Sequence, residues 1–177
     1  MWFGGNRARL LAATDCSDPL TQAVEAGVAA GHARRRITPQ RRANMLAIRD
    51  SARLSGDYET AIAELLQVVQ QYPGAEEAQR IVARLLHEMH DGRALDAWLG
   101  ISRRFPNSMD AFRTLISLTV RRSGADAAAL LMRSRFPVMP TRFQQLSAYA
   151  DACELVGERT EAEAVRTRLR QRAARRQ

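Results

Sequence analysis

The chain has 177 residues, of which 46% are apolar, and its formal net charge is +8. This length suits one packed domain or a short repeat array, and this composition excludes a disordered chain. All 27 basic residues are arginine, so P-loop proteins, kinases and pyridoxal enzymes, which need a lysine, are excluded as well.

Hydropathy and cysteine usage predict the compartment. No run of 18 apolar residues is present, as a membrane-spanning helix would need, and the first 20 residues lack a secretory pattern. Cys16 and Cys153 lie far apart and neither belongs to a CxxC pair. We therefore expect a cytoplasmic protein with two buried thiols.

The N-terminal segment, residues 1–41, is expected to hold a capping helix and an arginine-rich linker. Asp18 and Pro19 form a good helix start, and the helix is expected within residues 18–36. Gly27 and Gly31 are expected to weaken it by about 1 kcal/mol each relative to alanine. The first three residues have no periodic partner, so packing on this helix, docking on a partner and fraying all remain open.

A small residue recurs every 33 or 34 residues along the rest of the chain. The four anchors are Ala61, Ala94, Ala128 and Ala162. The residues four positions later are Leu65, Trp98, Met132 and Arg166, and a column 16 positions earlier holds Met45, Ala78, Phe112 and Leu146. Most of these columns are apolar and lie three or four residues apart, which is the period of one helix face. Four helical units in one register are predicted.

Turn residues divide each unit into two helices and separate the units. The breaks within units are "SGDY" (55–58), "HDGR" (90–93), "RSGAD" (122–126) and "VGER" (156–159). The breaks between units are "YPG" (72–74), "FPNS" (105–108) and "FPVMPT" (136–141). Thr141 and Gln144 read as a capping box at a helix start. Each unit is then a pair of antiparallel helices, which buries its apolar face only by stacking on its neighbours.

This pattern resembles the tetratricopeptide repeat (TPR). The stretch "GDYETAIAELLQVVQQYP" carries the match best, through Gly56, Tyr58, Ala61, Leu65 and Pro73, and the resemblance covers roughly residues 42 to 175. It implies an all-α fold, a right-handed α-solenoid of about four TPR-like repeats over residues 42–177, with a basic C-terminal capping helix. It also implies a concave groove, lined by the first helix of each pair, that holds segments of other proteins.

Carrying the repeat register over gives a candidate lining for that groove. The residues are Asp50, Arg53, Glu76, Gln79, His87, Arg113, Arg121, Gln144, Asp151 and Glu154. Their charges run from mixed through basic to acidic, so this lining has no single charge preference. Some of these residues could equally serve only to solubilise an open groove.

Two short segments make the chain basic. Residues 34–42 carry five arginines and residues 166–177 carry six, with no acidic residue in either. Possible anion contacts are Arg34, Arg35, Arg36, Arg166, Arg168, Arg170 and Arg172. Such contacts would lose affinity steeply with salt, but neither segment holds an aromatic residue for base stacking. Arginines that end a helix also interact favourably with its dipole, which is the simpler interpretation.

Catalytic and metal-binding patterns are weak. In "HEMH" (87–90) the two histidines stand three apart and would share a helix face, but a zincin needs a spacing of four and a further ligand. "FGGN" near the start has no strand before it, and neither cysteine has a motif around it. We expect no enzyme activity, no cofactor and no metal.

Three functions remain open. The leading hypothesis is a non-catalytic scaffold or adaptor that binds a segment of a partner protein in the groove. The second is an arginine-driven binder of RNA or of an anionic surface, and the third is an accessory subunit of an enzyme complex. Self-association into a homo-oligomer through an exposed apolar end is also open.

Overall fold

The computed structural model describes residues 18–33 and 35–175. Within those ranges the chain forms nine α-helices and no β-strand, so the predicted all-α class is confirmed. None of these helices is both long and apolar enough to cross a membrane. Met1, Trp2, Phe3, Cys16 and Arg34 fall outside the described ranges.

The chain divides into two compact units, residues 1–93 and 94–177. The boundary falls at the turn after the helix Glu76–Glu88, within the second predicted repeat. The N-terminal helix joins the first unit because it packs on the helices that follow it.

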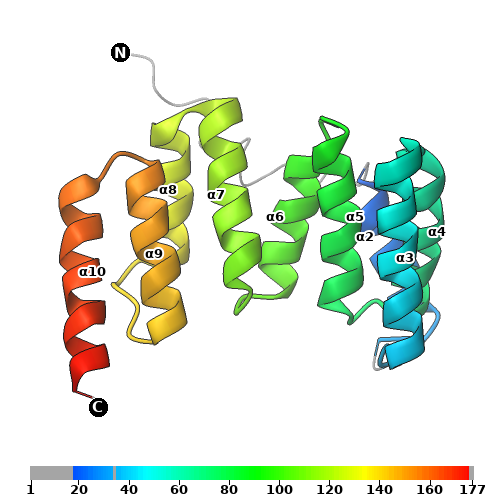
Figure 1. The fold of residues 1–177 in the computed structure, drawn as a ribbon, viewed down its shortest axis with the longest axis horizontal. Coiled ribbons are helices and arrows are strands. Elements are labelled where there is room, and N and C mark those ends of the chain that lie inside the picture. Colours follow the sequence, from blue (N-terminus) through cyan, green and yellow to red (C-terminus); the bar gives the residue numbers. More distant parts are fainter. Residues whose placement is uncertain (1–17, 34, 176–177) are drawn as a thin grey trace. The chain divides into compact units, whose positions relative to one another are not determined.

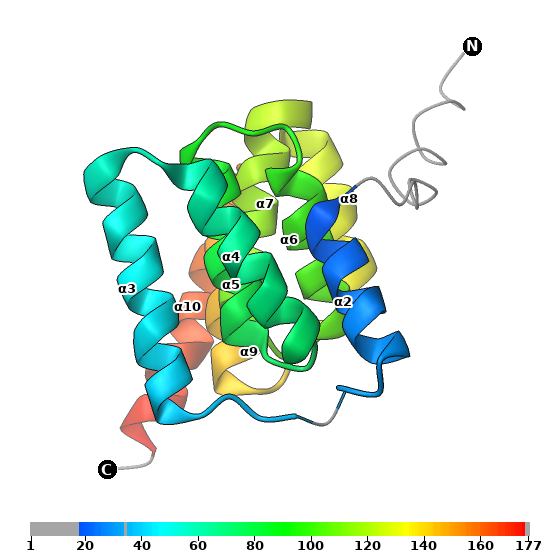
Figure 2. The same ribbon diagram turned by 90° about the vertical axis from the view of Figure 1, so that its right-hand side faces the viewer.

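The described part of unit 1 contains four helices, drawn from blue to green in Figure 1. They are α2 (Pro19–Ala29), α3 (Pro39–Ser55), α4 (Tyr58–Gln71) and α5 (Glu76–Glu88). α4 contacts the other three, and both α2 and α3 also contact α5. Figure 2 shows α4 between α2 and α3.

Side-chain caps explain where three of these helices begin. Asp18 accepts hydrogen bonds from the backbone N–H groups of Leu20 and Thr21, and a proline follows it at the first helical position, as predicted. The Thr38 hydroxyl accepts from the Arg41 N–H at 3.2 Å, and the Asp57 carboxylate caps α4 in the same way. Each cap satisfies a donor that the helix itself leaves unpaired.

The two glycines of α2 do more than weaken it. A Cβ on Gly27 would lie 2.1 Å from the backbone oxygen of Gln70, so this residue lets α2 approach the backbone of α4. Gly31 has φ of 78° and follows the helix, which ends at Ala29 and does not extend to residue 36. It stops the helix through its left-handed conformation. Gly31 therefore lies outside the helix and does not weaken its interior, contrary to the expectation.

Unit 2 contains five helices. They are α6 (Ala94–Arg104), α7 (Met109–Ser123), α8 (Ala125–Arg135), α9 (Phe143–Leu155) and α10 (Arg159–Ala174). α7 contacts α6, α8 and α9, and α9 also contacts α8 and α10. Figure 1 shows α7, α8 and α9 grouped together, with α10 beside α9.

The core of unit 2 is centred on aromatic and sulfur-containing side chains. Phe112, Met132 and Cys153 are buried in one cluster. Phe136 lies directly after α8. Its ring packs edge-on against Phe112, with ring centroids 5.2 Å apart, and against Tyr149, with centroids 5.9 Å apart. Edge-to-face contacts of this kind add to the stabilisation from buried area.

The predicted repeat register is confirmed by burial. All four anchor alanines are buried, and so are Leu65, Trp98 and Met132 in the next column. Each of the seven predicted breaks contains a gap between two helices. The predicted capping box is wrong, because α9 begins at Phe143 with Arg142 as its N-cap and has no side-chain cap.

Burial makes Cys153 a poor nucleophile. Its thiol is fully buried beside the Met132 sulfur, and desolvation, aided by the charge of Glu158, raises its pKa to about 11. A thiol reacts through its thiolate, which is scarce below that pH.

We expect Cys153 to resist alkylation in the folded protein. In a Cys16→Ser variant at about pH 8, iodoacetamide should modify Cys153 at least about 100-fold more slowly in buffer than in urea. Mass spectrometry against time gives both rates. Equal rates would show that the thiol is accessible and would contradict its burial.

Candidate functional site

The predicted groove residues of unit 1 lie on α3 and α5, but several use their charge inside the protein. Arg53 forms a two-pronged ion pair with Glu88, in which its Nε donates to Oε2 at 3.0 Å. This hydrogen bond lowers the pKa of Glu88 and raises that of Arg53. Asp50 is exposed and accepts from the Nε of Arg49 at 2.8 Å. The charge of Arg53 is therefore neutralised by Glu88 within the protein.

Gln79 cannot line an open groove, contrary to the expectation. Its side chain is 0% exposed, and its Nε2 donates to the carbonyl oxygen of Pro73 at 2.6 Å. The amide thereby satisfies a carbonyl in the turn between α4 and α5, where no helix supplies a donor. The residue is structural.

Replacing Gln79 should destabilise unit 1. In Gln79→Leu the volume is nearly kept but the Pro73 carbonyl loses its donor, so the free energy of unfolding should fall by about 2 kcal/mol. Chemical denaturation followed by circular dichroism measures this change. The matched control is Gln40→Leu, because Gln40 is exposed on the first turn of α3 and bonds only to Asn44. A loss no larger than in the control would contradict the structural role.

The two histidines of "HEMH" do not share a helix face. α5 ends at Glu88, and His90 lies beyond it with φ of 57°, in the left-handed region. His87 remains in the last turn of the helix. Among residues 18–33 and 35–175, no group of three or more histidine, cysteine or acidic side chains is placed to hold a metal ion.

Three of the predicted groove residues of unit 2 form ion pairs within the protein. Arg113 on α7 donates through Nε to Asp151 on α9 at 2.7 Å and through a second nitrogen to Ser147 at 3.1 Å. Glu154 pairs with Arg166 of α10, which lowers the pKa of the carboxyl. The remaining two residues, Arg121 and Gln144, are exposed.

The basic C-terminal helix is likewise engaged within unit 2. Besides Arg166, Arg170 pairs with Glu163 at 2.6 Å. Arg168 lies against the Met139 sulfur, and Arg172 donates to the carbonyl oxygen of Thr141. These contacts leave the helix with less free cationic surface than its sequence suggests.

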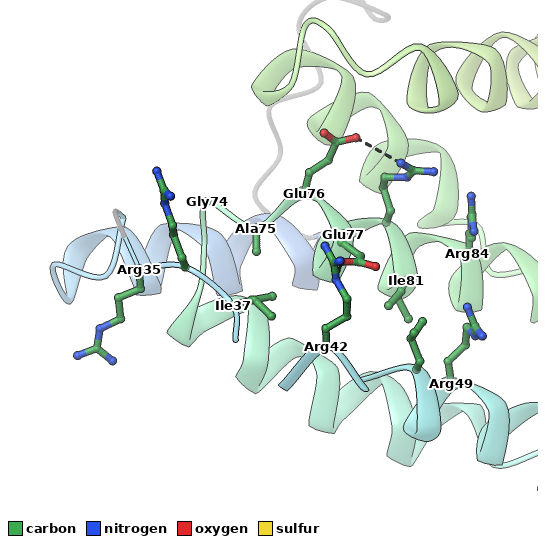
Figure 3. Close-up of a pocket in the computed structure, with 13 residues that line it drawn as sticks. Arg35, Ile37, Arg42, Arg49, Gly74, Ala75, Glu76, Glu77, Ile81 and Arg84 are labelled. Carbon is green, nitrogen blue, oxygen red and sulfur yellow. Dashed lines mark ion pairs between the residues drawn. The ribbon is translucent and has the colours of Figure 1, made fainter. Parts of the chain in front are cut away.

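A cleft in unit 1 brings arginines of the basic segment 34–42 together with arginines from α3 and α5. Its volume is about 560 Å³ and it lies between α3, α5 and the segment before α3 (Figure 3). Its charged lining residues are Arg35, Arg36, Arg42, Arg49, Arg80, Arg84, Glu76 and Glu77. The six arginines and two glutamates give it a formal charge of +4. We call it the arginine cleft.

On the two helices that line the cleft, four pairs of residues are each separated by 35 positions in the sequence. On α3 they lie at positions 42, 46, 49 and 53, and on α5 at positions 77, 81, 84 and 88. Because the steps are four, three and four on both helices, each set follows one helix face. The first three pairs line the cleft, and the fourth is the Arg53–Glu88 ion pair.

The chemistry of these pairs alternates. Arg42 and Glu77 form an ion pair at 2.6 Å. Leu46 and Ile81 follow as an apolar pair. Arg49 and Arg84 come next, and Figure 3 shows them at the same end of the cleft. The first and fourth pairs each combine an arginine with a glutamate. The third pair instead combines two arginines.

The remaining arginines of the cleft differ in how they are balanced. Arg80 lies 3.6 Å from Glu76. Within the described part of the chain, Arg35, Arg36 and Arg84 form no ion pair. Arg49 pairs only with its neighbour Asp50, whose side chain is 56% exposed. Among the described residues of the cleft, Arg35, Arg36 and Arg84 are thus the arginines without an ion-pair partner.

Comparison with known proteins adds no relative. The chain matches no protein-family model. A search of curated proteins finds no match either. The inference about function rests on the repeat register and on this cleft.

The sequence analysis named Arg35 and Arg36 as possible anion contacts and placed Arg42 in the same basic segment, but it missed Arg49, Arg80 and Arg84. A signal was present: four pairs at one separation, with steps of helical period, connect the first helices of two consecutive repeats. It could be recognised only once α3 and α5 were known to lie side by side.

Proposed function

We propose that this protein is a non-catalytic scaffold, a TPR-like right-handed α-solenoid of antiparallel helix pairs, that binds an extended segment of a partner protein. The observation that carries the proposal is the arginine cleft, because it opens between α3 and α5, the first helices of consecutive repeats. Those helices line the ligand-binding face in repeat proteins of this type.

Two features of unit 1 support a binding role for this face. The ends of the row are fastened by the Arg42–Glu77 and Arg53–Glu88 ion pairs, so the cleft walls are held before any ligand arrives. Its floor includes apolar groups that a side chain of a partner could cover. A preorganised surface loses less entropy on binding than a flexible one.

Binding of RNA or of an anionic membrane surface is the second candidate, because positive charge gathers in one cleft. The internal contacts of the arginines in α10 reduce its support. In the scaffold role the chain could equally serve as an accessory subunit of an enzyme complex, or associate with its own copies. In each case the arginine cleft would be the binding face, and only the identity of the partner would change.

An unbiased peptide library displayed on phage tests the proposal. The full chain, immobilised through its N-terminus, should enrich a family of peptides that bind saturably and keep most of their affinity at moderate salt. Enrichment should disappear for Leu46→Asp, which places a charge on the floor of the cleft. A chain that binds no peptide, but retains nucleic acid until nuclease is added, would support the second candidate instead.

A further inference from the structure

The Arg49–Arg84 pair identifies the chemistry that the cleft lacks. Along the facing surfaces of α3 and α5, the pairs at both ends set an arginine against a glutamate. At the Arg49–Arg84 position both members are cationic, and Figure 3 shows them at the same end of the cleft. An anion placed there would complete the row.

The surroundings of this pair make such an anion effective. The Arg49 side chain is only 22% exposed, so water screens its charge less than that of a fully exposed group. Guanidinium groups bind carboxylates through two parallel N–H···O bonds, which fixes the direction of approach. Asp50 can occupy one side of Arg49, and no described carboxylate pairs with Arg84.

An apolar contact lies next to the cationic pair. Leu46 and Ile81 precede Arg49 and Arg84 by three residues on their helices, which is an axial offset of about 4.5 Å. Ile81 is only 4% exposed, so a ligand that binds the arginines through a carboxylate can place a neighbouring apolar side chain on the half-buried Leu46. Both contacts lie in the same cleft.

We propose that the Arg49–Arg84 pair binds an acidic side chain of a partner protein, and that an apolar side chain two residues away in the partner packs on Leu46. Alternate side chains of an extended segment point to the same side about 7 Å apart, an offset that the long arginine side chains can accommodate. This inference rests on the proposed function and specifies its ligand, an acidic and apolar segment.

The lining of the cleft favours this ligand over a nucleic acid. No aromatic side chain lines it among the residues that the structure describes, so these residues offer no platform for base stacking. Glu76 and Glu77 also line the cleft, between Arg35 and the Arg49–Arg84 pair in Figure 3, and would repel a continuous phosphate backbone. A segment that alternates acidic and apolar residues avoids this repulsion, because only some of its positions are charged.

Fluorescence anisotropy with short labelled probes tests the inference. α3 is 17 residues long and spans about 25 Å, which matches an extended peptide of about eight residues. The first probe alternates leucine and glutamate with serine spacers, the second replaces each glutamate by glutamine, and the third is an oligouridine RNA. We expect the full chain to bind the glutamate peptide at least about tenfold more tightly than either other probe.

Arg84→Glu provides the decisive variant. It sets a carboxylate opposite Arg49, so the row is completed internally, and the melting temperature should stay the same or rise. Affinity for the glutamate peptide should nevertheless fall by at least about tenfold. The matched control is Arg103→Glu, because Arg103 is also an exposed arginine near the C-terminal end of its helix. It makes the same charge change outside the cleft and should leave affinity within about twofold.

The outcomes separate this inference from the function on which it rests. If the unbiased library yields neutral peptides that need Leu46 but not Arg84, the scaffold role stands and the acidic ligand is wrong. If no peptide binds saturably, both proposals fail. Tighter binding of the RNA, lost in Arg84→Glu, would assign the cleft to nucleic acid and overturn the inference.

Discussion

Phe112→Ala should lower the free energy of unfolding of unit 2 by about 4 kcal/mol. Phe112 is 1% exposed and its ring meets the edge of Phe136, which in turn meets Tyr149. Truncation leaves a cavity in the centre of the cluster and removes one aromatic contact, and the two costs add. Urea denaturation measures the loss. In a Trp2→Phe background, fluorescence from the buried Trp98 of α6 reports on unit 2 alone.

Phe143→Ala is the matched control for this prediction. Phe143 is the first residue of α9 and is 49% exposed, so the same truncation there should cost less than about 1 kcal/mol. Similar losses for the two variants would show that the Phe112 site is not a packed core. The comparison also tests whether the segment that carries Phe136 is fastened to the core as the structure places it.

Local sequence rules predicted the helix boundaries best where a local cap defines them. The Asp18 cap with Pro19 was recognised from two adjacent residues, and the structure shows its hydrogen bonds. The buried alanine anchors were found from their spacing alone. Thr141 shows the limit of such rules, because its capping pattern with Gln144 was present and the helix began two residues later.

Residues that act across helices were the ones the sequence did not assign correctly. Gln79 had the register of a groove residue, yet it turns inward to the Pro73 carbonyl. Whether a polar side chain faces a ligand or a backbone group depends on the path of the neighbouring turn, which periodicity does not contain. The same reason explains why Arg53 and Arg113 were expected to contact a partner, although their carboxylate partners lie within the protein.

The arginine cleft could not be predicted from the sequence for the same reason, because its residues come together only across helices. Net charge along the sequence directed attention to residues 34–42 and 166–177, where arginines are consecutive. In space, the C-terminal arginines find internal partners, while Arg84, isolated in sequence, lies in the cleft with Arg35 and Arg36. Charge density along a chain and charge density on a surface differ whenever helices from separate repeats are neighbours.

Gly27→Ala should separate α2 from α4 and lower the free energy of unfolding of unit 1 by about 3 kcal/mol. The new Cβ would lie 2.1 Å from the Gln70 oxygen and 2.9 Å from its carbonyl carbon. Both atoms belong to the backbone of α4, so no side-chain rotation can relieve the overlap. The gain in helix propensity, about 1 kcal/mol, is smaller than the lost packing of Leu20 and Val24, which are buried on the same helix.

Gly92→Ala is the control that separates packing from glycine chemistry. A Cβ at Gly92 meets nothing within 4 Å, so this substitution should change stability by less than about 1 kcal/mol. Hydrogen exchange measured by mass spectrometry shows which part of unit 1 opens, and protection should fall first in α2. If Gly27→Ala were as stable as the natural chain, α2 could not approach α4 as closely as the structure places it.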